Sequence, residues 1–297
     1  MLLQAFIHHL RYERNAAERT QHEYESDLKA FEAYFRALDD GLAWTNVDAD
    51  VARDWMASMI ERGLKPSTVQ RRAAALRTFY RYLLEHGHIA VDPMHTLKTP
   101  RRERPLPVFV RDDEMNRLLD QQGMFADTFE GRRDRLIVAV FYHTGLRRSE
   151  LVQLDIDDVD LGRRQLVVRH AKGGKQRIVP FGEELAKMLE SYIAERVPRT
   201  QARDDGHALF VDSRGRRMTP AKVYAMVRHQ LGMVTTLRKR SPHVLRHTFA
   251  TSMLNHRANL QAVKELLGHS RLATTEIYTH ISFEDLKREY ANAHPRA

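Results

Sequence analysis

One stretch of this chain has the period of neither a helix nor a strand. Residues 96–110 read TLKTPRRERPLPVFV, with three prolines and a cluster of basic side chains. Proline fixes a backbone torsion and offers no N–H, so such a stretch favours an extended connection over a packed element. A chain of 297 residues also usually divides into two domains. We therefore expect a domain at 1–95, a linker at 96–110 and a second domain at 111–297.

The overall charge indicates the kind of partner. The chain has 48 Lys and Arg against 39 Asp and Glu, a net charge of +9, which favours a polyanion such as nucleic acid. A membrane surface is the competing polyanion, but the sequence has no long apolar run, secretory signal or lipidation motif. We expect a cytoplasmic protein that binds nucleic acid and no membrane. The absence of cysteine excludes disulfides, thiol catalysis and cysteine-based metal centres.

The linker has a reach that suits DNA binding. About 15 residues span roughly 50 Å when fully extended, which exceeds twice the width of a DNA duplex. Two domains joined in this way can lie on opposite faces of one duplex. The sequence therefore predicts a DNA clamp.

The first third of the chain predicts a small bundle of amphipathic helices. Its best-marked helix follows KPST, where Pro66 with Ser67 or Thr68 marks the start and Gly87 the end. The expected apolar stripe consists of Val69, Ala73, Leu76, Phe79 and Leu83. The opposite face carries Arg71, Arg72, Arg77 and Arg81. That face is either an ordinary solvated surface or, given the net charge, a DNA-binding surface.

The second domain changes character along its length. Helices are expected near 111–120 and 132–145, followed by two β-branched runs in RRQLVVRHAKGGKQRIVPF that predict a β-hairpin with a basic tip. Helices return after Gly182, with breaks near 206–217 and 238–241. The fold class is thus mostly α with one small β-sheet, as a helical bundle plus an α-rich second domain.

The hairpin tip AKGGKQR does not predict a nucleotide site. It lacks the spacing of a phosphate-binding loop and lies between strands instead of opening a helix. Lys172 in this tip is either a solvated turn lysine or a basic side chain that reaches into a groove.

The segment HTGLRRSEL predicts a phosphate-binding site. Gly145 ends one helix, Arg147 stands at the start of the next, and Glu150 follows one turn later. A helix start presents free N–H groups, and an arginine there adds a forked donor that matches two phosphate oxygens.

The segment SPHVLRHTFATSML predicts a helix that begins near Ser241. Leu245, Phe249 and Met253 form its buried stripe, and the adjoining side carries His243, Arg246 and His247. Two histidines four residues apart also occur as zinc ligands. Here the residues between them are Val-Leu-Arg, without the glutamate of a zinc protease, and the cationic arginine repels a metal. Phosphate binding is the favoured interpretation, and no metal site is expected.

The segment NLQAVKELLGHSRLATTEIYTH contains another helix. Its expected core stripe consists of Leu260, Val263, Leu266 and Leu267. Gly268 ends the helix, and His269 follows, which alone would suggest a cap or packing residue. Tyr278 comes nine residues later and, as one of 10 tyrosines, would by itself be an ordinary core aromatic.

Four motifs together suggest a family. In order and spacing, TGLRRSEL, AKGGKQRIVP, HVLRHTFAT and ELLGHSRLATTEIYTH resemble the active-site boxes of the tyrosine site-specific recombinases, the phage-integrase family. The terminal AHPRA is similar to the bacterial Xer pair, and DDEMNRLLD with YANAHPRA favours one member of that pair. The resemblance extends over nearly the whole chain, because the N-terminal part resembles the helical core-binding domain of the family.

The resemblance implies a nucleophile, Tyr278, and a phosphate-activating set. That set consists of Arg147, Lys172, His243, Arg246 and His269. A phenol with a pKa near 10 is ionised in about one molecule in a thousand at pH 7, a deficit of roughly 4 kcal/mol. Arginines on the phosphate would offset this deficit in the transition state. Either histidine could handle the tyrosine proton, and Lys172 is the hypothetical acid for the leaving 5′-oxygen.

The resemblance also implies partners and a product. The product is a reversible 3′-phosphotyrosine link, which needs neither a cofactor nor a metal. The implied partners are a double-stranded DNA recombination site, a second Xer-type recombinase in a cyclic heterotetramer, and a DNA translocase of FtsK type, acting to resolve chromosome dimers. The alternatives are an integrase of a mobile element, a non-catalytic DNA-binding protein of the same fold, and a histidine-based metallonuclease.

The C-terminal tail predicts a helix with an apolar stripe. Phe283, Leu286 and Tyr290 recur at helical spacing. The tail therefore either docks into a neighbouring subunit or packs on its own domain.

Overall fold

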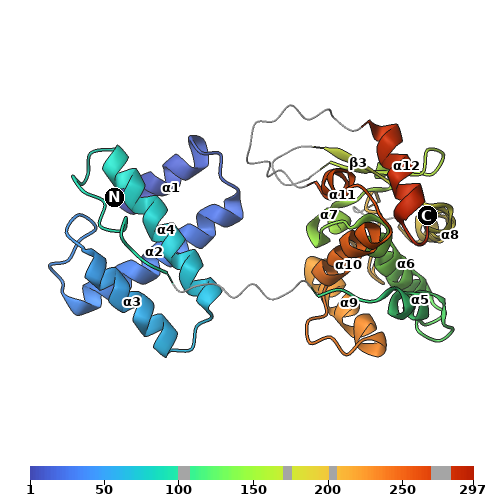
Figure 1. Cartoon of the computed structure of the whole chain (residues 1–297), viewed down its shortest axis with the longest axis horizontal. Coiled ribbons are helices and arrows are strands. Elements are labelled where there is room, and N and C mark those ends of the chain that lie inside the picture. Colours follow the sequence, from blue (N-terminus) through green and yellow to red (C-terminus); the bar gives the residue numbers. More distant parts are fainter. Residues whose placement is uncertain (100–107, 170–175, 201–205, 269–281) are drawn as a thin grey trace. The chain divides into compact units, whose positions relative to one another are not determined.

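The structure is a computed structural model that describes residues 1–99, 108–169, 176–200, 206–268 and 282–297. The chain divides into two compact units, Met1–Pro105 and Leu106–Ala297 (Figure 1). Residues 100–107, the greater part of the expected linker, lie outside the described residues. Within the described residues, none of the helices is both long and apolar enough to cross a lipid bilayer.

The N-terminal unit is a bundle of helices around an aromatic core. Its helices are α1 (Leu2–Tyr12), α2 (Glu18–Leu38), α3 (Ala49–Glu61) and α4 (Pro66–Glu85). Helix α2 packs against the other three. The ring of Trp44 lies edge-on to Phe35 and Phe79, at centroid distances of 5.1 and 4.7 Å, a geometry that aromatic pairs favour.

Helix α4 forms where its sequence pattern predicts. It begins at Pro66, after Lys65 as the N-cap residue, and Gly87 follows its end with a left-handed backbone (φ +69°). All five residues of the expected apolar stripe are fully buried. The stripe is thus confirmed as the face that α4 contributes to the core.

The charged face of α4 is mostly engaged within its own unit. Arg71 pairs with the buried carboxylate of Asp27, and the carbonyl of Leu97 accepts a hydrogen bond from Arg77. The Nε atom of Arg72 lies 3.4 Å from Asp27, and its guanidinium lies over the ring of Trp55. Three of the four arginines on this face therefore help to hold the bundle together. Arg81 is exposed.

The C-terminal unit is mostly helical with a small antiparallel sheet, which confirms the expected fold class. Its helices are α5 (Asp112–Asp120), α6 (Phe129–Thr144), α7 (Arg148–Gln153), η1 (Ile156–Asp158), α8 (Glu183–Thr200), α9 (Pro220–Val234), α10 (Pro242–Asn255), α11 (Leu260–Leu267) and α12 (Phe283–Ala293). Strands β2 (Gln165–Val168) and β3 (Arg177–Pro180) form the expected hairpin, with Leu166 opposite Val179. The short strand β1 (Val159–Asp160), which the sequence pattern did not indicate, pairs with β2.

A close junction joins α6, α10 and α11. Helix α6 packs along α10, and Gly145 ends α6 with a left-handed backbone (φ +60°). A Cβ atom at Gly145 would lie 2.5 Å from the ring of Phe249 on α10 and 2.8 Å from the side chain of Leu267 on α11. Only glycine fits both the backbone and the space. The turn before α7 is therefore held against the other two helices.

Helices α10 and α11 test two predicted core stripes. In α10, Leu245, Phe249 and Met253 are all buried, as expected. In α11, the expectation for Leu260 is wrong: this residue is the first of the helix, and its side chain is 53% exposed. Ala262 is buried in its place, and the other stripe residues, Val263, Leu266 and Leu267, are buried as expected.

The tail packs on its own unit. On α12, Leu286 and Tyr290 are buried in the core of the C-terminal unit, and Phe283 is half-buried. Helix α12 contacts α10, α11 and β3 (Figure 1). Of the two alternatives for the tail, the single chain therefore adopts the one in which the tail packs on its own domain. Docking of Leu286 and Tyr290 into a neighbour would require them to leave this core.

Candidate active site

Arg147 stands between α6 and α7, where the sequence pattern predicts. Its backbone N–H donates to Oε2 of Glu150 at 2.7 Å, and its Nη1 donates to Oε1 of the same carboxylate at 2.6 Å. The Arg147 side chain remains 29% exposed. Glu150 thus satisfies the open N–H of the helix start and orients the guanidinium at the same time.

Arg246 reaches the same place from α10. Its Nη1 donates to the carbonyl of Gly145 at 2.8 Å, and its Nη2 donates to the carbonyl of Leu267 at 2.6 Å. Its side chain is only 6% exposed. Burial and the charge of Arg147 both lower the pKa of Arg246, although a guanidinium stays cationic at neutral pH. An anion bound here would relieve that electrostatic cost.

A third arginine, Arg177, was not indicated by the sequence pattern. It is the first residue of β3, and its Nη1 and Nη2 donate to the two oxygens of Glu150 at 2.9 and 2.8 Å. Its Nε donates to the carbonyl of Leu266 at 2.9 Å. In the sequence Arg177 simply continues the basic hairpin tip, and no local period distinguishes it from the solvated charges around it.

Glu150 is the anionic centre of this cluster. Its side chain is 1% exposed. Burial alone would raise its pKa, but the hydrogen bonds and charges of Arg177 and Arg147 lower the pKa of Glu150 to about 2. Three guanidiniums and one carboxylate leave the cluster with a net charge of +2, which favours an anionic ligand.

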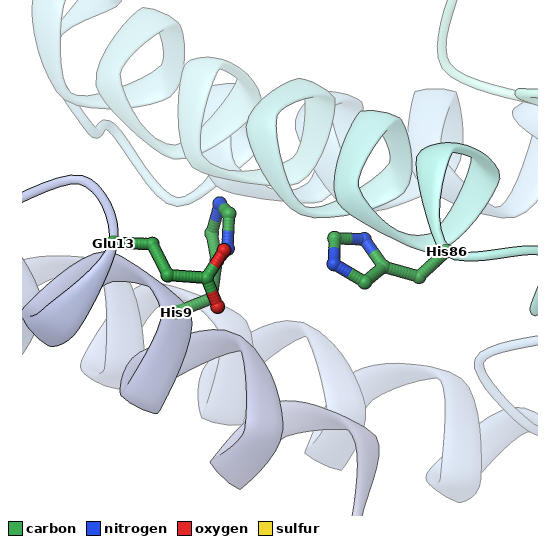
Figure 2. A group of neighbouring side chains, drawn as sticks. All are labelled: His9, Glu13 and His86. Carbon is green, nitrogen blue, oxygen red and sulfur yellow. The ribbon is translucent and has the colours of Figure 1, made fainter.

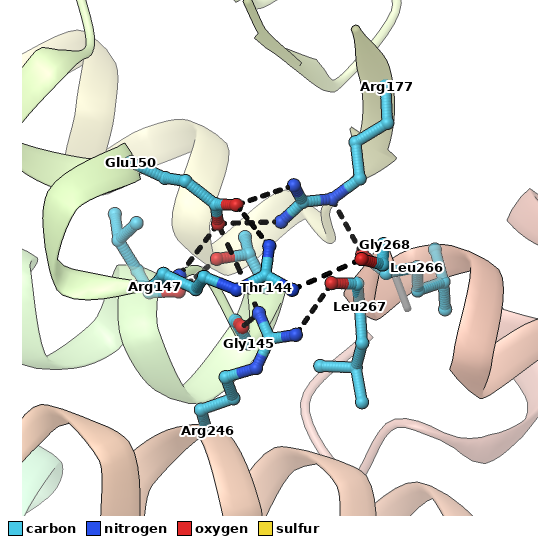
Figure 3. Close-up of polar contacts among 10 residues, drawn as sticks. Thr144, Gly145, Arg147, Glu150, Arg177, Arg246, Leu266, Leu267 and Gly268 are labelled. Atoms are coloured by element: carbon cyan, nitrogen blue, oxygen red, sulfur yellow. Dashed lines mark hydrogen bonds and ion pairs between the residues drawn. The ribbon is translucent and has the colours of Figure 1, made fainter. Parts of the chain in front are cut away.

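The three arginines also cap the C-terminal end of α11. Its last carbonyls, those of Leu266, Leu267 and Gly268, accept hydrogen bonds from Arg177, Arg246 and Arg147 respectively (Figure 3). Helix ends leave such carbonyls unpaired and partly negative, so cations are favourable there. The cluster therefore fixes the end of α11, directly before His269 in the chain.

Arg147, His243 and Arg246 line one pocket of about 310 Å³. Its other lining residues are Leu146, Arg148, Tyr224, Ser241 and Pro242. Three of the six residues proposed from the sequence thus lie together, from the start of α7 and the first turns of α10. The other three, Lys172, His269 and Tyr278, lie outside the described residues.

The surroundings of the two histidines of α10 favour the neutral form of both rings. The rings of His243 and His247 lie 4.5 Å apart. Burial, followed by neighbouring cationic groups, lowers the pKa of both. A neutral imidazole can accept a proton or donate a hydrogen bond.

A three-ligand metal group does not form around His243 and His247 within the described part of the chain. Within the described residues, a group with the spacing of metal ligands lies instead in the N-terminal unit. It consists of His9, Glu13 and His86, which face one another (Figure 2). The Nδ1 atom of His9 lies 2.9 Å from Oε2 of Glu13, and Nδ1 of His86 hydrogen-bonds the carbonyl of Tyr82 at 2.9 Å. The ring of Tyr82 lies 4.9 Å from His9 and 4.1 Å from His86. These contacts account for the group as packing between α1 and α4.

Both units of the chain match known protein families. Residues 109–285 match the phage integrase family, and residues 3–87 match the N-terminal SAM-like domain of phage integrases. The tyrosine recombinase XerC of Azotobacter vinelandii is 42% identical over 296 residues, which cover 99% of this chain and 96% of the relative. XerC of Pseudomonas aeruginosa is 38% identical, with 99% and 95% covered.

Solved structures share the fold. The Tn1549 transposon integrase in complex with transposon right end DNA has a TM-score of 0.73 at 21% identity, with 98% of both chains covered. The XerH site-specific recombinase bound to difH substrate has a TM-score of 0.68 at 24% identity, with 96% of this chain and 82% of that chain covered.

The chain therefore belongs to the phage integrase family and is a tyrosine recombinase enzyme. Within that family it groups with the Xer-type recombinases and, among these, with XerC. The preference for one member of the Xer pair, which DDEMNRLLD and YANAHPRA indicated as XerC, is thereby confirmed.

Proposed function

We propose that the chain cuts and rejoins double-stranded DNA at a specific site through a 3′-phosphotyrosyl intermediate on Tyr278. The observation that carries this proposal is the convergence of Arg147, Arg246 and His243 on one pocket with a net positive charge beneath it. A pocket of this kind suits a DNA phosphate that is attacked by a phenol. The reaction needs cations beside two phosphate oxygens and a group nearby that accepts the phenol proton.

In this proposal the arginines hold the scissile phosphate. Each guanidinium has five N–H groups. Arg147 and Arg246 each use two nitrogens for the contacts described above, so further N–H groups remain for phosphate oxygens. As the Tyr278 oxygen attacks phosphorus, negative charge grows on the oxygens that the two arginines bind, and preformed cations stabilise that transition state.

The step balances without a cofactor. A bond forms between phosphorus and the Tyr278 oxygen, and the bond from phosphorus to the 5′-oxygen breaks. The phenol proton passes to a histidine, either His243 or His269, and the 5′-oxygen takes a proton that we assign to Lys172. The new ester keeps the energy of the broken one, so a second 5′-hydroxyl reverses the step.

The proposed partners rest on the resemblance to the Xer-type recombinases. XerC proteins are the relatives named above, and XerH was solved on a difH substrate. We propose that this chain acts in the cytoplasm with a second Xer-type recombinase in a cyclic heterotetramer, and that it resolves chromosome dimers under control of a DNA translocase of FtsK type.

A covalent-trapping experiment tests the chemistry. The protein is incubated in EDTA with sheared chromosomal DNA of its own organism, and DNA that stays joined after denaturation is sequenced to find the site. A duplex of that site, nicked beside the cleavage position, is then used as a suicide substrate. We expect a covalent adduct from the wild type, none from Tyr278→Phe, and a normal amount from the control Tyr12→Phe, an exposed tyrosine of the N-terminal unit.

Other outcomes would favour the rival functions. An adduct that survives in Tyr278→Phe would rule out the nucleophile. Specific binding without any adduct would favour a non-catalytic DNA-binding protein, and cleavage that EDTA abolishes would favour a metallonuclease. A site that maps to a mobile element would favour an integrase.

A further inference from the structure

Arg177 links three parts of the C-terminal unit that carry the proposed site. Its backbone belongs to the hairpin, where it pairs with Val168 across the antiparallel strands. Its side chain reaches Glu150 on α7 and the carbonyl of Leu266 at the end of α11 (Figure 3). Arg147 and Arg246 join α7, α10 and α11, and Arg177 adds the sheet to the same network.

We propose that Arg177 is a positioning residue of the recombinase, which ties β3 to Glu150 and to the end of α11. This inference rests on the function proposed above. In this inference Arg177 fixes the positions of Arg147 and Arg246 relative to the hairpin, whose tip contains Lys172, and relative to the end of α11, which His269 follows in the sequence.

The geometry requires an arginine. Each of the three side-chain nitrogens makes one described contact, at 2.8 to 2.9 Å, and two of them form a parallel pair with the carboxylate. A lysine keeps the charge, but it has a single nitrogen and cannot make the parallel pair together with the carbonyl bond.

Arg177 also touches the residue that precedes His269. Gly268 ends α11 with a left-handed backbone (φ +64°), and a Cβ atom there would lie 3.1 Å from Cδ of Arg177. The aliphatic part of Arg177 therefore packs against Gly268 while its Nε binds the carbonyl of Leu266. A shift of Arg177 would move the point from which the segment after Gly268 begins.

Arg177 acts through other residues and not on DNA directly. Its side chain is 10% exposed, and it does not line the pocket formed by Arg147, His243 and Arg246. Its loss would leave the buried carboxylate of Glu150 with Arg147, directly before α7, and with Arg246 on α10, whose Nη1 lies 4.0 Å away.

The test compares cleavage with binding in Arg177→Lys and Arg177→Met. Single-turnover adduct formation on the nicked duplex is measured at saturating protein, and DNA affinity is measured separately. We expect the adduct rate of both variants to fall by roughly 100-fold, the effect of a misplaced catalytic group. The Kd for DNA should change by less than about threefold, because many phosphate contacts share the binding energy. The control is Arg163→Met, which removes a 79% exposed arginine between β1 and β2 and should cleave at the wild-type rate.

The pH profile separates positioning from simple loss of structure. In wild type the pKa of Glu150 is about 2, so this carboxylate does not titrate between pH 5.5 and 8. Without Arg177, burial raises that pKa while Arg147 and Arg246 remain as its cationic neighbours. The acid limb of the cleavage rate should therefore move to higher pH in Arg177→Met. In Arg177→Lys, which retains a cation, it should move less.

Each result decides the question. Folded Arg177 variants that cleave at the wild-type rate, or that cleave slowly only because the Kd has risen, would overturn the proposal. An Arg177→Lys protein that does not fold would make Arg177 a folding residue instead. If the wild type forms no adduct, the proposed function fails first, and that result is distinct from a failure confined to the Arg177 variants.

Discussion

Glu150 carries the only negative charge in the cluster that it forms with Arg147, Arg177 and Arg246. Glu150→Gln keeps the shape of the side chain but leaves three close guanidiniums without a counter-charge. Removal of one partner from a buried ion pair costs about 3 kcal/mol or more. We expect the free energy of unfolding at pH 7, measured by urea denaturation, to fall by about 3 kcal/mol.

The control for this change is Glu190→Gln, at an exposed position on α8. It should alter the free energy of unfolding by less than about 0.5 kcal/mol. An equally stable Glu150→Gln protein would mean that the three arginines do not depend on this carboxylate.

Lys172 is proposed as the acid that protonates the leaving 5′-oxygen. Lys172→Ala should therefore cleave an ordinary nicked duplex slowly, by a factor of about 100 or more. A duplex with a sulfur atom at the 5′ bridging position has a leaving group that needs no acid, so it should restore the rate of Lys172→Ala. Arg246→Lys, which alters the phosphate-binding site, should not be rescued, and an unrescued Lys172→Ala would exclude the acid role.

For single residues, local sequence patterns identify some members of the site, and tertiary contacts identify others. Arg147 stands at a helix start and Arg246 beside the periodic stripe of a helix, so local patterns were enough to select both, and the structure brings them together in one pocket. The role of Arg177 depends on its contacts with Glu150 and with the carbonyl of Leu266, which is 89 positions away in the sequence. No window of local sequence contains that information.

At the scale of elements, helix starts and ends were predictable because glycine and proline have local steric causes. Gly145, Gly268 and Pro66 mark helix ends or starts in the structure as in the sequence pattern. Strand β1 was not predictable, because its two residues are too few to show a period and depend on pairing with β2. The packing partner of α12 was not predictable either. An apolar stripe shows that one face of a helix is buried, but it does not show which element covers that face.

The end of α12 predicts an acid-sensitive step in stability. His294 is 5% exposed, and its Nε2 hydrogen-bonds the carbonyl of Tyr142 at 3.2 Å while its Nδ1 accepts from the N–H of Arg296 at 3.1 Å. Only the neutral ring can donate at one nitrogen and accept at the other. Burial lowers the pKa of His294 to about 4, against the opposing effect of the Tyr142 carbonyl.

A depressed histidine pKa makes the folded state lose stability as pH falls. The unfolded chain binds a proton near pH 6.5 and the folded chain only near pH 4, so the contribution is complete above pH 6.5 and is lost toward pH 4. From pH 7.5 to pH 5, His294 should lower the free energy of unfolding by about 2 kcal/mol. His294→Asn should remove this part of the slope, and the exposed control His229→Asn should keep it. An unchanged slope in His294→Asn would assign the acid sensitivity to other groups, such as the buried His143.

At the scale of the whole molecule, charge and the division into two units bear on how DNA is held. The net charge of +9 and the proline-rich stretch at 96–110 were evident from the sequence, and the chain does divide near that stretch. What the sequence could not reveal is how many basic side chains are already committed. Three arginines of the α4 face bind Asp27, Trp55 or the Leu97 carbonyl, and of these three Arg71 stays exposed, at 41%. Arg81, which is also exposed, is therefore the first side chain of this face to test for a DNA contact.

Salt dependence measures these contacts directly. Each phosphate contact that releases a counterion adds about 0.9 to the slope of log affinity against log salt. If both units grip one duplex, the full chain should show a steep slope, and Arg81→Gln should reduce it by about 0.9 without changing site preference. Arg19→Gln, which removes an 85% exposed arginine of α2, serves as the control and should leave the slope unchanged. A shallow slope in the wild type would contradict the clamp itself. A steep slope that Arg81→Gln does not alter would retain the clamp but show that the face of α4 lies away from DNA.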